Sequence, residues 1–120
     1  MDFLAIWNDK FGELLSDLRV IFGNDADLTM LSAGFTFAVA ASKDGAWKVF
    51  HDQVAVPYGA RILQHDERFF LEFEDVPNAI DIIGRVRNAW HELSPDNQAA
   101  IWDYFTLLVK LSNRVAASRA

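Results

Sequence analysis

Apolar residues recur every three or four positions along the first 22 residues of the chain. This recurrence consists of Leu4, Trp7, Phe11, Leu14, Leu18 and Ile21. An α-helix returns to the same face every 3.6 residues, so the spacing predicts an amphipathic helix over about residues 2–22. Gly23 is typical of a helix end, and either Asp25 or Asp27 can cap the start of a following helix.

The stretch from Leu28 to Ser42 contains no charged residue. Four of its apolar residues recur at helical spacing, namely Leu28, Leu31, Phe35 and Val39. Met30, Phe37 and several alanines spread apolar surface over the other side, and the alternation over residues 35–39 also permits a short strand. A helix that is apolar nearly all round either lies in the centre of a core or faces another subunit.

The rest of the chain predicts further helices joined by short connections. We expect a helix over residues 46–54, with Pro57 ending it or starting a new short turn, and a short helix with a loop over 65–75. Another helix is expected from about Pro77 to residue 93. The last helix is expected over about 95–116, with Ser94 as its N-cap and Pro95 at its first position. The chain is thus predicted to be all-α, a compact bundle of five or six helices forming a single domain over residues 1–120.

In this bundle the first and last helices are expected to pack on each other. The residues expected at that contact are Leu4, Trp7, Phe11 and Leu14 on the first helix, and Ile101, Phe105 and Leu108 on the last. Short connections make neighbouring helices antiparallel.

Composition excludes several classes of function. The chain has no cysteine, which rules out disulfides, thiolate metal sites and thiol catalysis. The net charge of −6 lacks the basic surface that supplies most non-specific affinity for nucleic acid, so we expect no nucleic-acid partner. No uncharged apolar run reaches about 18 residues, so no membrane span is expected. The first residues lack the basic segment of a signal peptide, and we expect an intracellular protein.

Residue patterns that carry chemistry are equally sparse. His51, His65 and His91 lack the i, i+4 spacing that places two metal ligands on one helical face. The paired carboxylates, such as Asp66 with Glu67, lie in a polar stretch and are expected to be solvated. There is no glycine-rich phosphate loop and no nucleophile motif. We therefore expect no enzyme, no catalytic residue, no cofactor and no metal.

The aromatic content points to a protein–protein contact. Ten phenylalanines, four tryptophans and two tyrosines are many for the interior of so small a domain, although an aromatic-rich core would also account for them. We expect some of this apolar surface to bind a second copy or another protein. The candidate interface residues are Met30, Ala33, Gly34, Phe37, Ala38 and Ala41, with Phe69 and Phe70 as a second choice.

Two blocks of residues form a recognisable pattern. The first block contains Val54, Pro57, Tyr58, Ile62, Asp66, Glu67, Phe69, Phe70 and Leu71. The second contains Trp90, Leu93, Ser94, Asn97, Ile101, Trp102, Tyr104, Leu108 and Leu111. A shorter part of the pattern consists of Asp17, Leu18, Ile21, Phe22, Asp25, Asp27 and Leu28. Together these residues resemble those of small proteins encoded by nucleocytoplasmic large DNA viruses, and the resemblance spans nearly the whole chain. Members tend to have proline where this chain has Gly23, and they contain more lysine and less alanine.

The resemblance implies a small all-helical protein, with no family activity or catalytic residue to carry over. Combined with the aromatic content, it predicts a non-enzymatic viral structural or interaction protein. Such a protein would be a minor virion component located in the virion or the host cytoplasm, with itself or another virion protein as partner. The alternative is a small intracellular adaptor that binds a host protein. Abundant copies in purified particles would favour the structural hypothesis.

Overall fold

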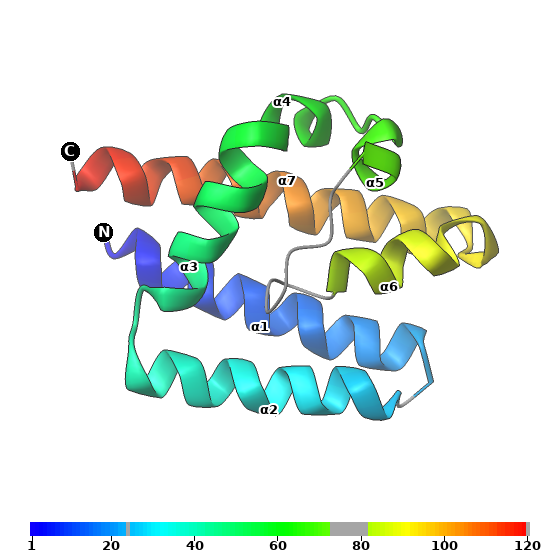
Figure 1. Cartoon of the computed structure of the whole chain (residues 1–120), viewed down its shortest axis with the longest axis horizontal. Helices are drawn as coiled ribbons and strands as arrows, with labels where there is room; N and C mark the ends of the chain where they lie inside the picture. The colour runs from blue at the N-terminus through cyan, green and yellow to red at the C-terminus, as the bar shows by residue number, and fades with distance from the viewer. Residues whose placement is uncertain (24, 73–81, 120) are drawn as a thin grey trace.

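The computed structural model describes residues 1–23, 25–72 and 82–119, and these residues are almost entirely helical (Figure 1). The α-helices are α1 (Phe3–Ile21), α2 (Ala26–Ala41), α3 (Gly45–Phe50), α4 (Val56–Leu63), α5 (Arg68–Glu72), α6 (Ile82–Ala89) and α7 (Pro95–Ser118). The described part of the chain contains no strand, so the all-α prediction is confirmed and the strand alternative over residues 35–39 is wrong. The predicted helix start near Pro77 lies outside the described residues.

Helix α1 lies between α2 and α7 and runs antiparallel to both (Figure 1). The predicted packing of the first helix on the last is therefore confirmed. Of the residues expected at this contact, Leu4 is half-buried and the others are buried in one apolar core: Trp7, Phe11, Leu14, Ile101, Phe105 and Leu108. Because α1 and α7 pack together, α2 is left on the outside of the bundle.

Side-chain caps start the long helices where the sequence predicts. The Ser94 hydroxyl accepts a hydrogen bond from the backbone N–H of Asn97 at 3.2 Å, with Pro95 as the first residue of α7. At the start of α2 the Asp25 carboxylate accepts from the N–H groups of Asp27 and Leu28. Asp25 is therefore the cap, and Asp27 is a residue of the helix. Each cap satisfies amide groups that a helix cannot pair within itself.

A helical stretch continues through Pro57, where the sequence predicted either a helix end or the start of a new short turn, and Pro57 lies in the first turn of α4. Residues His51–Ala55 form a π-helical segment that joins α3 to α4, with the N–H of Val56 bonded to the carbonyl of His51. Proline lacks an N–H, and its ring clashes with the carbonyl four residues earlier in a regular α-helix. The wider π-helical turn accommodates the ring, so the chain bends without ending the helix.

We predict that Trp7→Ala destabilises the fold by about 3–5 kcal/mol, because Trp7 is fully buried and its ring stacks on Phe11 at a centroid distance of 5.2 Å. Denaturant unfolding of the variant measures this change. Val20→Ala on the same helix is the control, since Val20 is 79% exposed and its loss should change stability by less than about 0.5 kcal/mol. Equal effects of the two substitutions would contradict the assignment of Trp7 to the core.

Candidate interaction surface on α2

The inner face of α2 holds the helix against α1. Leu28 is buried, and Leu31, Phe35 and Val39 are half-buried on the same side of the helix. The Phe35 ring lies against Phe11 of α1 at a centroid distance of 4.8 Å. These contacts use the apolar stripe that the sequence predicted, so α2 has one face in the core.

The opposite side of α2 is also apolar, and it is open to solvent. Met30 is 73% exposed and Phe37 is 80% exposed. All six α2 residues that the sequence singled out are exposed, and together they are called the outer face of α2: Met30, Ala33, Gly34, Phe37, Ala38 and Ala41. Their exposure in the single chain leaves them accessible to a partner, while their role as an interface stays a prediction.

The outer face differs from the other exposed apolar residues in its extent and its lack of charge. Helix α2 spans 16 residues, and its charged residue, Asp27, lies in its first turn. Exposed Val56 and Leu63 share a side of α4, which is an 8-residue helix that includes Arg61. No helix of the described residues is both long and apolar enough to cross a membrane. The outer face is thus an uncharged strip along a helix that lies on the surface of the bundle.

The second candidate surface, at Phe69 and Phe70, is absent from the folded chain. Both side chains are buried in the core. The centroid of the Phe70 ring lies 4.7 Å from that of Trp90 and 5.1 Å from that of Trp102. The preceding acidic pair explains this placement. Asp66 binds the backbone N–H of Arg68 at the start of α5, and Glu67 accepts a 2.7 Å hydrogen bond from the Trp90 indole.

Ionic contacts fix the N-terminal end of α2. The Arg85 guanidinium of α6 pairs with the carboxylates of Asp25 and Asp27, the latter at 3.3 Å. The same guanidinium lies 5.9 Å from the centre of the Phe22 ring, at the end of α1. Arg85 therefore connects α6 to the turn between α1 and α2.

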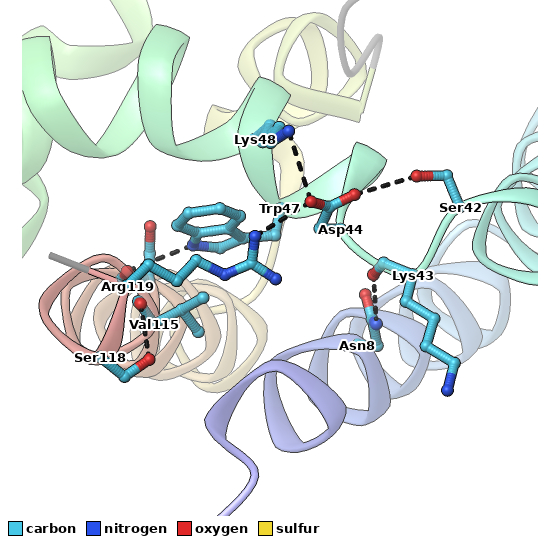
Figure 2. Close-up of polar contacts among 10 residues, drawn as sticks. Asn8, Ser42, Lys43, Asp44, Trp47, Lys48, Val115, Ser118 and Arg119 are labelled. Carbon is cyan, nitrogen blue, oxygen red and sulfur yellow. Dashed lines mark hydrogen bonds and ion pairs between the residues drawn. The ribbon is translucent and has the colours of Figure 1, made fainter.

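A second polar cluster fixes the C-terminal end of α2 (Figure 2). The Asp44 carboxylate accepts from the Ser42 hydroxyl at 2.9 Å and pairs with Arg119 at 3.0 Å and Lys48 at 3.3 Å. Arg119 also lies over the Trp47 ring, 5.0 Å from its centre. These contacts join the turn after α2 to the end of α7, and they hold the pKa of Asp44 at about 2 through the Ser42, Arg119 and Lys48 hydrogen bonds.

Lys43 lies beside this cluster but takes no part in it through its side chain. Its backbone carbonyl accepts a 2.9 Å hydrogen bond from the Asn8 amide of α1. Its side chain is exposed and points away from Asp44 (Figure 2). A free ammonium group therefore follows the uncharged strip, at the end opposite Asp27.

The structure also brings together a serine and a histidine that the sequence did not connect. The Ser112 hydroxyl of α7 lies 2.6 Å from Nδ1 of His51, and the Ser112 carbonyl accepts from the Trp47 indole at 3.2 Å. Serine beside histidine can form a nucleophile and a base. Here Ser112 is fully buried, where a substrate cannot reach its oxygen, so the pair joins α7 to the π-helical segment. His51 is half-buried at this contact.

A shallow groove between α1 and α7 is smaller than a typical pocket for a small ligand. It encloses about 210 Å³, and Leu18 and Ile101 are among its lining residues. At its edge the Tyr104 hydroxyl donates to Asp17, and desolvation together with this bond raises the pKa of Tyr104 to about 12. Pockets for small ligands typically enclose about 300–1,000 Å³. Among the described residues, no group of three histidine, aspartate or glutamate side chains is placed to hold a metal ion.

Comparison of the chain with protein-family models, curated proteins and solved structures found no match. The function of the chain is therefore inferred from its own residues and their arrangement.

We predict that Arg119→Ala raises the pKa of Asp44 from about 2 toward 3.8, because a cation that stabilises the carboxylate is lost. A folded-state pKa below the unfolded value stabilises the fold above about pH 4, and this contribution is lost as the pH falls toward 2. An NMR titration of the Asp44 carboxyl measures the shift. Arg114→Ala, which removes another exposed arginine of α7, should leave Asp44 unchanged. A wild-type midpoint near 3.8 would contradict the cluster.

Proposed function

We propose that the chain is a non-enzymatic interaction protein that binds a protein surface through the outer face of α2. The observation that carries the proposal is the exposure of Met30 and Phe37 on an uncharged helical strip. Soluble monomers rarely keep a contiguous apolar patch larger than a few hundred Å², and larger patches mark contact sites. Full burial of a Met or Phe side chain contributes about 1.5–3 kcal/mol, so these two residues can supply the centre of an interface.

The rigidity of α2 also supports a binding role. Phe35 holds the middle of the helix on α1, Asp25 caps its start, and the turn after it is tied to α1 and α7. A surface that is already ordered loses little conformational entropy on binding. The outer face is therefore preorganised for a partner.

We propose more specifically that this interaction protein is a structural or interaction component of a virus, present in the virion or the host cytoplasm. Its support is the resemblance of the two sequence blocks to small proteins of large DNA viruses. The contact between Glu67 and Trp90 joins a residue of the first block to one of the second, which gives that pair a structural reason to occur together. The adaptor that binds a host protein uses the same outer face and differs in its partner.

The test places a photo-reactive amino acid at Phe37 and activates it in the cells that produce the chain. We expect covalent adducts of defined mass, because a partner that covers the outer face lies within reach of position 37. The mass identifies the partner as a second copy, another component of the particle or a host protein. Ala38→Glu in the same chain should remove these adducts while the circular dichroism spectrum stays helical, since Ala38 is exposed.

The matched control carries the photo-reactive group at Asn113, an exposed residue of α7. Adducts at position 37 that equal those at position 113, or that persist in Ala38→Glu, would contradict the proposed function.

A further inference from the structure

The outer face of α2 has a spacing that reads the same in both directions along the helix. Its central stripe consists of Met30, Gly34, Phe37 and Ala41, separated by four, three and four residues. Ala33 and Ala38 flank this stripe on its two sides. A rotation by 180° about the midpoint between residues 35 and 36 therefore exchanges position 30 with 41, 33 with 38, and 34 with 37.

We infer that the partner of the outer face is a second copy of this chain, packed with its α2 antiparallel to the first. This inference rests on the proposed function and names its partner. In this register Met30 faces the partner's Ala41, and Phe37 faces the partner's Gly34. Each large side chain meets a small one, which is the arrangement that lets facing helices interdigitate. A parallel register places Phe37 against the partner's Phe37 and leaves the two glycines facing each other.

Charge favours the same arrangement. The strip ends at Asp27, which is exposed, and is followed at the other end by Lys43, whose ammonium points into solvent. Antiparallel packing brings Lys43 of each copy toward Asp27 of the other, whereas parallel packing places like charges together. The chain carries a net charge of −6, and two copies approach through α2 with no carboxylate between Leu28 and Ser42. The strip itself therefore brings no like charges together when two copies meet along it.

The length of α2 limits the size of the contact. Sixteen helical residues extend about 24 Å. Two helices of that length bury on the order of 1,000 Å² in total, which is the lower limit for a specific interface. We therefore expect a reversible dimer that dissociates on dilution.

The variant Gly34→Leu tests whether association depends on the packing of Gly34 against the partner's Phe37 or only on the apolar character of the outer face. A Cβ atom added at Gly34 meets no atom within 4 Å in the single chain, and position 34 is exposed, so we expect the variant to fold. In the antiparallel dimer the new leucine collides with the partner's Phe37, and we expect the association constant in sedimentation equilibrium to fall about tenfold or more. Thr36→Leu is the control, because it adds the same side chain to an exposed position of α2 outside the outer face. Stronger association of Gly34→Leu would overturn the register.

Disulfide formation tests the orientation directly, since the chain has no cysteine of its own. Met30→Cys, carrying a size tag, is mixed with untagged Ala41→Cys under mild oxidation. Antiparallel helices place positions 30 and 41 within disulfide reach, whereas two copies of position 30 lie about 16 Å apart along the helix. We therefore expect the mixed dimer to form in at least tenfold excess over either dimer of like variants.

Dimers of like variants that form as readily as the mixed one would overturn the antiparallel arrangement. No crosslink beyond that of Asn113→Cys, together with a monomeric wild-type chain in sedimentation, would overturn the second copy as partner. The proposed function would then be tested separately by the photo-adducts at Phe37. Adducts that contain a different protein would support it, and their absence would contradict it.

Discussion

Helix α2 is apolar on two opposite faces, and the bundle can cover only one of them. Its inner face meets α1 through Phe35 and Phe11, whose rings lie 4.8 Å apart. Helix α1 packs on α7 and α3 with other parts of its apolar surface. No further element of the described chain lies beyond α2 (Figure 1). Because burial of apolar surface is the main stabilising contribution to folding and association, the uncovered face is the feature most able to bind.

The remaining contacts join both ends of α2 to other elements. Arg85 joins the start of α2 to α6, and Asp44 joins the turn after α2 to Arg119 at the end of α7. Both ends of a 16-residue helix are thus fixed to other elements, while its middle rests on aromatic rings. Exposed ion pairs contribute little to stability individually. Their consequence here is geometric, since they hold the outer face in one orientation.

Much of the fold could be predicted from local sequence, because helix periodicity and N-caps depend on neighbours in the chain. The caps at Asp25 and Ser94 are of this kind. The packing of α1 on α7 follows instead from the apolar stripes of the two long helices. Phe37 is exposed, as expected of a residue at a surface contact, whereas the burial of Phe69 could not be predicted, because it depends on which helices meet in space. The same holds for His51, whose hydrogen-bonding partner Ser112 lies 61 residues further along the chain.

The outer face of α2 is open in the single chain, and we propose that it is covered when two copies associate. Brief hydroxyl-radical oxidation of methionine, read by mass spectrometry over a range of chain concentrations, tests it most directly. Met1 is 95% exposed and Met30 is 73% exposed, so the first serves as an internal reference for the second. We expect rapid oxidation of Met30 in dilute solution and several-fold protection at high concentration, with Met1 unchanged. Oxidation of Met30 relative to Met1 that is slow in dilute solution, or that does not change with concentration, would contradict it.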